Sequence, residues 1–354
     1  MRENSRFNRR IKNLPEAIWR RIAQIDELKG RWATGASLSP QALGRLKQSV
    51  LVTSTGASTR IEGARLSDEE VEKLMRGIAV RKFRDRDRQE VRGYYELLAN
   101  VFESWETVKF SDGMIKHFHK ELLTYAEKDE RHRGEYKKQE NRVEMKDADA
   151  NIVEVLFAPT PPYLTPKEMQ ELIGWTQLAL AGGKPHPLLI IGNFIFEFLA
   201  IHPFQDGNGR LSRILTNLLL LQQGYAFAPY ASHEKLVERH KADYYITLRR
   251  SQKTWKSTHE DITMWLNFFL QLILQQAETA VALLSKEQIE KLLSPKQFAV
   301  WKYIEKVPEA TPGDIAQAAD VARPTVNQAL NALLRLNKIE RIGLGRTTRY
   351  RKVT

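Results

Sequence analysis

The segment IHPFQDGNGRLSR, from Ile201 to Arg213, places a histidine, a carboxylate, an asparagine and two arginines close together in the sequence. Its two glycines and its proline weaken any helix or strand, and its charged groups gain nothing from burial. A purely structural role therefore explains the segment poorly. An anionic substrate is the first hypothesis.

The flanking sequences predict that this segment joins two buried helices. LLIIGNFIFEFLAI precedes it and RLSRILTNLLLLQQGY contains its end, and both are apolar with helical spacing. A glycine-rich turn into a helix presents main-chain N–H groups and the positive end of the helix dipole. Gly207 and Gly209 allow the backbone to approach phosphate oxygens closely. The turn is therefore a candidate anion site.

The side chains of the segment supply the remaining chemistry. Arg210 and Arg213 are three residues apart, so they lie on neighbouring positions of one helix face, and their planar forks match phosphate oxygens. Asp206 offers the hard oxygen ligand that Mg²⁺ takes. His202 accepts a proton near neutral pH. Together these groups predict the transfer of a phosphoryl or nucleotidyl group to a hydroxyl.

The whole segment resembles the signature of the Fic family, H-P-F-x-[D/E]-G-N-G-R-x-x-R, and matches it at every defined position. The His-Pro pair or the DGNG turn alone is most often structural, but the joined pattern is highly specific. The resemblance implies an all-helical Fic fold. It also implies transfer of AMP from ATP to a Ser, Thr or Tyr hydroxyl of a target protein or of the chain itself. The branch that transfers a phosphoryl group carries Lys where Gly209 stands, which favours AMP transfer here.

The same resemblance implies a role for each residue. His202 is the catalytic base, and Asp206 binds Mg²⁺, the expected cofactor beside the substrate ATP. DYYITL resembles the later segment whose tyrosines approach the nucleotide, with a less specific match, and it adds Tyr244 and Tyr245. The residues assigned to the phosphates are Gly207, Asn208, Gly209, Arg210 and Arg213.

A second motif lies far upstream, in TSTGASTRIEGARLS. Ser58 to Gly63 fit [S/T]-x-x-x-E-[G/N], which resembles the inhibitory motif of many Fic proteins; alone it would indicate only a capped helix end. The resemblance implies that Glu62 pairs with Arg213 and removes the donor meant for the γ-phosphate. A bidentate, charge-assisted pair is worth about 1.5–3 kcal/mol, or roughly 10 to 100-fold in activity. In some members this glutamate also supports removal of AMP, which stays an alternative.

The spacing of apolar residues predicts a mainly helical chain. The exception is a hairpin between Arg133 and Phe157, which resembles the flap that pins the target chain in Fic proteins. After Leu293, three short helices and an alternating segment around a glycine predict a winged helix-turn-helix. We therefore expect an N-terminal helical region with the inhibitory motif over residues 1–100, a Fic domain over 101–285 and a winged helix over 286–354.

The charge pattern suggests a further partner. The net charge is +12, and residues 293–354 carry eleven Lys or Arg against five Asp or Glu. A recognition-like helix begins at Arg323, and the wing carries Arg346, Arg349 and Arg351. These types contact DNA, although winged helices also dock proteins. The alternative function is thus a DNA-binding transcriptional regulator whose Fic domain senses nucleotide.

Other sequence features bear on the compartment in which the protein works. The chain has no cysteine, which fits a reducing compartment such as the cytoplasm and excludes thiolate chemistry. Its most apolar run contains Asn193 and Glu197, so we expect a buried helix and no contact with membranes. The start lacks the apolar core of a signal peptide. RKFRDRDRQEVR, from Arg81, is interpreted as a charged and solvated helix start.

Overall fold

The computed structural model describes residues 5–35, 40–77, 86–141, 143–146, 152–335, 338–343 and 348–353. The chain forms two compact units, Met1–Val281 and Ala282–Thr354. The division into three domains stays a prediction. Within the described ranges, no helix combines the length and the apolar character that crossing a bilayer requires.

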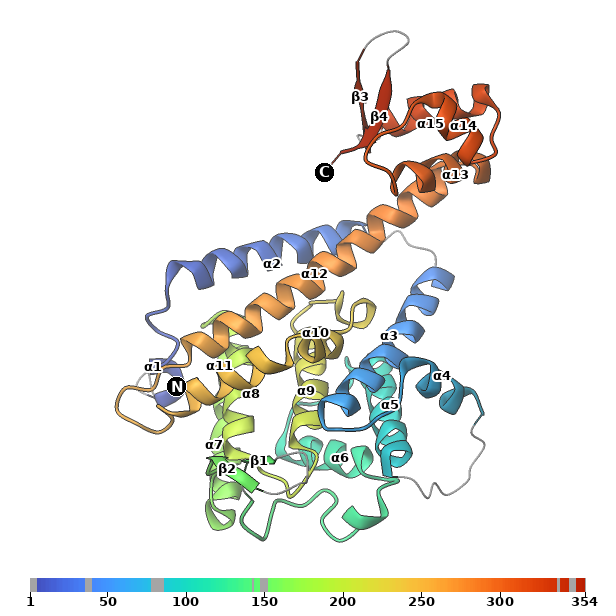
Figure 1. Cartoon of the computed structure of the whole chain (residues 1–354). Coiled ribbons are helices and arrows are strands. Elements are labelled where there is room, and N and C mark those ends of the chain that lie inside the picture. Colours follow the sequence, from blue (N-terminus) through green and yellow to red (C-terminus); the bar gives the residue numbers. More distant parts are fainter. Residues whose placement is uncertain are drawn as a thin grey trace. The chain divides into compact units, whose positions relative to one another are not determined.

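The first unit is mainly helical, which confirms the predicted fold class (Figure 1). Its helices are, in chain order, α1 (Arg6–Arg9), α2 (Glu16–Gly35), α3 (Pro40–Ile61), α4 (Asp68–Gly77), α5 (Arg86–Ser104), α6 (Asp112–Leu122), α7 (Thr165–Gly182), α8 (Pro187–Ile201), α9 (Asn208–Gln222), α10 (His233–Arg239) and α11 (Lys241–Gln252). The long helix α12 (Thr263–Leu292) starts in this unit and runs into the next.

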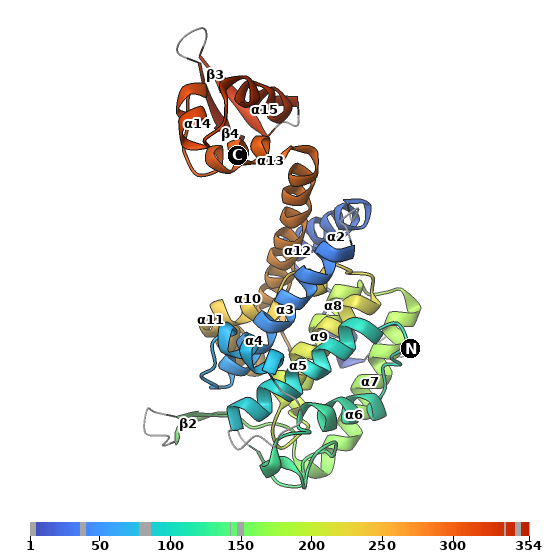
Figure 2. The same ribbon diagram turned by 90° about the vertical axis from the view of Figure 1, so that its right-hand side faces the viewer.

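Helices α8 and α9 form the centre of the first unit (Figure 2). Every residue of α8 after Pro187 is buried, because α7 and α9 pack against it and the apolar side chains of α12 cover it. Helix α9 packs in turn against α3, α5, α6 and α10. A helix that is apolar on all sides belongs in such a core. The loop between α8 and α9, residues 202–207, is therefore held at both ends by buried helices.

Two polar residues of α8 are buried because the amino-terminal helix supplies their partners. Arg10 donates from Nη1 to Glu197 Oε2 at 2.7 Å and from Nε to Asn193 Oδ1 at 2.5 Å, and Arg6 also pairs with Glu197. Burial raises the pKa of Glu197, but the charges of Arg10 and Arg6 outweigh it and hold that pKa below its usual value. A buried carboxylate without partners would be strongly destabilising.

The predicted hairpin is confirmed, with antiparallel strands β1 (Val143–Lys146) and β2 (Ile152–Phe157). Its first strand begins later than the sequence pattern indicated. Residues 134–141 instead form an irregular segment whose donors bond to the loop after α8; the amide of Lys137, for example, donates to Pro203 O at 2.9 Å. Those donors are consequently not available to a strand ladder.

The second unit contains α13 (Pro295–Ile304), α14 (Pro312–Ala318) and α15 (Arg323–Arg335), followed by the antiparallel strands β3 (Ile339–Ile342) and β4 (Arg349–Lys352). It has its own core, formed by residues such as Val300, Ile315, Val326 and Leu333. Three helices and a hairpin are the order expected of a winged helix, which stays our interpretation of this unit. Arg346 lies outside the described residues.

Candidate functional site

The loop between α8 and α9 takes two left-handed residues to turn the chain. His202 ends α8 with φ 52° and ψ 61°, and Gly207 precedes α9 with φ 81°. The first hydrogen bond inside α9 runs from Leu211 N to Gly207 O, so the amides of residues 208–210 come before it. A helix start of this kind attracts anions through its N–H groups and its dipole.

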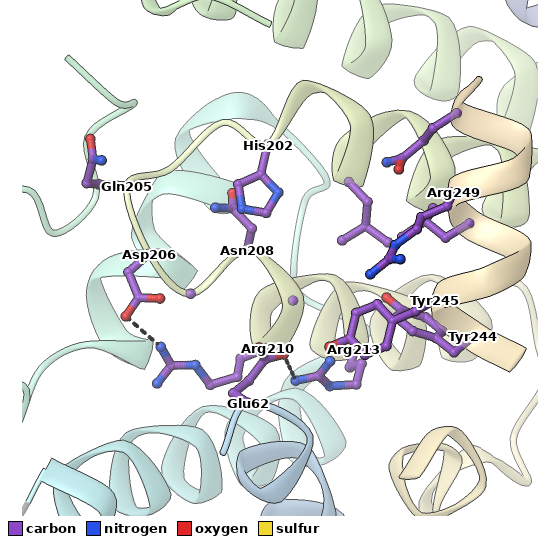
Figure 3. A pocket seen from close by; sticks show the side chains of 15 residues that line it. Glu62, His202, Gln205, Asp206, Asn208, Arg210, Arg213, Tyr244, Tyr245 and Arg249 are labelled. Carbon is purple, nitrogen blue, oxygen red and sulfur yellow. Dashed lines mark hydrogen bonds and ion pairs between the residues drawn. The ribbon is translucent and has the colours of Figure 1, made fainter. Parts of the chain in front are cut away.

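A pocket opens over this helix start (Figure 3). It is lined by Glu62, Leu199, His202, Gln205, Asp206, Gly207, Asn208, Gly209, Arg210, Arg213, Tyr244, Tyr245, Leu248, Arg249 and Gln252. The structure thus brings together the residues that the sequence assigned to one site, from three separate parts of the chain. Ser58 does not line the pocket, but it contacts Arg213 from behind.

His202 lines the pocket at the end of α8. Burial, and after it the charge of Lys137, lowers the pKa of His202 to about 4. The imidazole is therefore neutral near pH 7 and can accept a proton. A base must be in this form before it reacts.

Arg213 is held by the end of α3. Its side chain is buried, and it donates from Nε to Ser58 Oγ at 2.8 Å and from Nη2 to Ser58 O at 3.0 Å. Nη2 also donates to Glu62 Oε1 at 2.7 Å. Burial lowers the pKa of Arg213, but the carboxylate of Glu62 outweighs this and raises the pKa above its usual value. The guanidinium is therefore charged, and its donors are bound by Ser58 and Glu62.

The contact between Glu62 and Arg213 is through one carboxylate oxygen, whereas the sequence indicated a bidentate pair. Ser58 explains the difference, because its hydroxyl and its carbonyl take two donations from the same guanidinium. Ser58 and Glu62 therefore act on Arg213 together. Figure 3 shows the Glu62–Arg213 contact at the edge of the pocket.

Arg210 is engaged by two carboxylates. Its Nη2 lies 3.0 Å from Asp206 Oδ2, and its Nη1 lies 2.9 Å from Glu90 Oε2 on α5. Arg86 reaches the same Asp206 oxygen at 3.2 Å from the start of α5. Arg86 is exposed, as expected for a charged and solvated helix start, but its pairing with Asp206 was not predicted. Neither Arg86 nor Glu90 carried a motif, so only the fold places them here.

The donor set around Asp206 fits Mg²⁺ bound together with a nucleotide. Among the described residues, no group of three or more His, Cys, Asp or Glu side chains is arranged to hold a metal ion. Mg²⁺ commonly takes only one or two carboxylates and completes its shell with water and substrate phosphates. Burial raises the pKa of Asp206, but Arg210 and other neighbours outweigh it, so the carboxylate stays charged.

Asn208 closes the loop with its side chain. Its Oδ1 accepts from Phe204 N at 2.9 Å, and its Nδ2 donates to Phe204 O at 2.7 Å. His119 of α6 stacks on the ring of Phe204 and contacts Asp206 O at 3.0 Å through Nε2. His119 Nδ1 accepts from Gly134 N, so Nε2 carries the proton. Both polar atoms of the Asn208 side chain are therefore engaged by Phe204, which leaves its main-chain amide at the helix start to meet an anion.

Helix α11 forms the opposite wall of the pocket. Tyr244 packs against Trp265, and burial raises the pKa of Tyr245 to about 12, so that tyrosine stays protonated near neutral pH. Leu248, Arg249 and Gln252 continue the same helix face into the pocket, and the sequence analysis missed them. Their spacing of three, four and seven residues after Tyr245 was the signal that could have found them.

Comparisons with known proteins agree on one family. Residues 109–220 match the family described as Fic/DOC. A probable protein adenylyltransferase of Aquifex aeolicus is 34% identical over 93 residues, which are 25% of this chain and 27% of that protein. A Fido domain-containing protein of Dictyostelium discoideum is 38% identical over 82 residues, 21% of this chain and 54% of that protein. The chain therefore spans between about a quarter and half of these relatives.

The solved structures extend the likeness beyond the matched segment. A Fic family protein from Desulfovibrio desulfuricans is 25% identical with a TM-score of 0.62, covering 96% of this chain and 97% of that one. A Fic domain-containing signaling protein from Bacteroides thetaiotaomicron is 20% identical with a TM-score of 0.60, covering 74% of this chain and 97% of that one. The second likeness concerns the fold alone.

Proposed function

We propose that this chain, which carries a Fic domain over residues 109–220, is a protein adenylyltransferase that is inhibited by its own α3. The observation that carries the proposal is a single pocket in which a neutral histidine faces a helix start, while the arginine beside it is paired with Glu62. The neutral His202 supports proton removal. The helix start supports phosphate binding.

The reaction moves the AMP group in one displacement. The oxygen of a target hydroxyl forms a bond to the α-phosphorus of ATP, the bond from that phosphorus to the β-bridging oxygen breaks, and pyrophosphate leaves. His202 takes the hydroxyl proton, and the amides at the start of α9 bind phosphate oxygens. Asp206 would hold Mg²⁺, which neutralises phosphate charge when it is bound.

Inhibition follows from the state of Arg213. Its guanidinium cannot bind the γ-phosphate while Ser58 and Glu62 hold three of its donations. The Glu62 carboxylate also places a negative charge where the triphosphate must lie, and like charges repel. ATP consequently binds in a pose that does not react.

The test compares Glu62→Gly with the wild type in the presence of Mg²⁺ and ATP labelled at either the α- or the γ-phosphate. Glu62→Gly should incorporate more α-label into protein than the wild type, by about 10 to 100-fold if the pair is worth 1.5–3 kcal/mol. The γ-label should not be incorporated. Label transfer from the γ-position would instead indicate a kinase.

Two further variants make the result specific. Adding His202→Ala to Glu62→Gly should reduce the rate by about 100 to 10,000-fold, as expected for loss of a positioned base. Glu106→Gly removes an exposed glutamate from the turn after α5 and should behave as the wild type. Equal or lower α-label in Glu62→Gly than in the wild type would contradict the proposal.

A second proposed function is binding of duplex DNA by the second unit, and the exposed face of α15 supports it. Apart from Pro324 in the first turn, the exposed residues of α15 are polar or basic, namely Arg323, Asn327, Gln328, Asn331 and Arg335, and α15 contains no acidic residue. Asn, Gln and Arg are the types that contact base edges. The wing supports it less, because Arg349 pairs with Glu309 and Arg351 with Glu340.

Titration of labelled duplex DNA at several salt concentrations tests this second function. Affinity should fall steeply as salt rises, since phosphate contacts release counterions. Replacing Arg323 and Arg335 together by Gln should weaken binding, while Lys138→Gln in the first unit should not. Absence of binding at low salt would remove this function from consideration.

A further inference from the structure

Four consecutive carbonyl groups, those of residues 201–204, lie at the end of α8 and in the loop after it, and the segment 137–141 donates to all of them. The amide of Lys137 donates to Pro203 O at 2.9 Å, and its Nζ donates to Ile201 O at 3.1 Å. Asn141 Nδ2 lies 3.3 Å from His202 O and 2.9 Å from Phe204 O. The main chain around His202 is thus fixed from one side.

The two donors are joined to each other. Lys137 Nζ also donates to Asn141 Oδ1 at 2.8 Å, which fixes the orientation of the amide. Lys137 is only 4% exposed, and burial lowers its pKa to about 8. Burying an ammonium group is unfavourable, and an apolar side chain of similar size would avoid the penalty. A buried lysine here therefore needs a reason other than stability.

The conformation of His202 supplies that reason. A residue other than glycine in the left-handed region is less stable by roughly 1–2 kcal/mol, and such a residue persists only where its surroundings hold it. His202 has φ 52°, and the carbonyls on both sides of it are held by Lys137 and Asn141. The left-handed turn directs the imidazole into the pocket rather than along α8.

We infer that Lys137 and Asn141 are positioning residues for His202, which hold its main chain so that the imidazole faces the reacting hydroxyl. They also connect the base to the hairpin, because β1 begins at Val143, two residues after Asn141. This inference rests on the proposed function.

The charge of Lys137 also lowers the pKa of His202. The groups that act on His202 are Lys137, which lowers its pKa, and Glu62 and Asp206, which raise it. Lys137 itself faces Glu168, Glu140 and Lys256. In a Glu62→Gly background Asp206 remains, so loss of the ammonium should raise the pKa of His202, while burial, the largest cause, still holds it below its usual value. The acid limb of the rate profile then moves to higher pH.

The experiment uses the full chain with Glu62→Gly as the parent. Lys137→Met and Asn141→Leu should lower kcat by about 10 to 100-fold, because misplacing a catalytic group by an ångström has effects of this size. KM for ATP should not change, since neither residue lines the pocket. Lys137→Arg should recover most of the rate. The matched control is Lys138→Met, which removes an exposed lysine next in the chain.

A readout that does not depend on activity is the titration of His202 by NMR in histidine-labelled protein, with the signal assigned by its loss in His202→Gln. Lys137→Met should titrate at a higher pH than the parent, and Lys137→Arg close to the parent. Thermal unfolding shows that each variant is folded.

The outcomes separate the two proposals. An inactive Glu62→Gly parent would contradict the proposed function, while the His202 titration would still decide the positioning role. An active parent with unchanged kcat in both Lys137→Met and Asn141→Leu would overturn the inference. So would a His202 titration that is the same in the parent and in folded Lys137→Met. If Lys137→Met does not fold, the kcat of Asn141→Leu tests the positioning role. An unchanged kcat in that variant would overturn it.

Discussion

The backbone conformation at position 207 favours glycine over every other residue. Its φ of 81° lies in the region that glycine enters freely and other residues enter with strain. A Cβ there would meet Leu122 and His119 at 3.4 Å and 3.6 Å, which are ordinary contacts. The expected penalty for a side chain is therefore conformational and does not come from crowding.

Gly207→Ala should accordingly lower the free energy of unfolding by about 1–2 kcal/mol. It should also lower AMP transfer, because the strain tilts the amides at the start of α9. Urea denaturation and α-label incorporation measure the two effects. Gly113→Ala is the control, since it lies in α6 with no heavy atom within 4 Å of an added Cβ. Equal urea midpoints for the two variants would contradict the expectation.

Single residues could be predicted where the chemistry is contiguous in the sequence. His202, Asp206 and Arg213 lie in one segment, and the structure places all three in one pocket. Arg86 and Lys137 could not be found in this way. Arg86 lies 120 residues before Asp206, and Lys137 lies 64 residues before Ile201. Their contacts exist only because α5 and the segment before the hairpin pack against the loop.

At the scale of elements, the end of α3 is held in place by residues other than Ser58 and Glu62. Arg60 donates from Nε to Glu238 of α10 at 2.6 Å and from Nη2 to Asp68 of α4 at 2.8 Å. Lys241 Nζ donates to Ile61 O at 2.7 Å, which satisfies a carbonyl at the helix end. These contacts hold the last turn of α3 where Glu62 can reach Arg213.

Arg60→Gln should therefore loosen this turn and raise AMP transfer in the presence of an intact Glu62. The expected increase is about two- to fivefold, because each partly exposed ion pair contributes about 0.2–1 kcal/mol. Incorporation of α-label measures it. Arg20→Gln, which removes an exposed pair on α2, should leave the rate unchanged. An unchanged or lower rate in Arg60→Gln would show that α3 does not need this attachment.

The bounds of helices and strands were predicted well where the apolar periodicity is strong. They were predicted poorly where long-range hydrogen bonds decide the local structure. The apolar helix before His202 was clear from its sequence. The start of the hairpin was placed too early, because residues 134–141 form no strand and the amide of Lys137 donates instead to Pro203 O in the loop after α8.

At the scale of the whole molecule, buried histidines link stability to pH. Burial is the main cause that lowers the pKa to about 4 for His119, His202 and His233. In the unfolded chain each has its usual pKa near 6.5. Between pH 6.5 and 4 the unfolded state thus binds more protons than the native state. The stability from these groups is complete above pH 6.5 and is lost as the pH falls to 4.

The free energy of unfolding should fall between pH 6.5 and 4.5 by about 1.4 kcal/mol per pH unit for each of these histidines. Urea denaturation at pH 7 and pH 5 measures the slope. His233→Gln should reduce the slope by about a third, since one of three groups is removed. His117→Gln should not change it, because His117 is exposed on α6. A slope that His233→Gln leaves unaltered would contradict this assignment.

The buried pair between Arg10 and Glu197 limits how early during synthesis the first unit can complete its folding. The two residues are 187 positions apart. Ribosomes add about 5–20 residues per second, so Arg10 waits about 10 to 40 s after its own synthesis before Glu197 exists. During that interval the amino-terminal arginines are without the acidic partner that finally buries them. The helix that carries His202 at its end is consequently completed late, by a segment synthesised well before it.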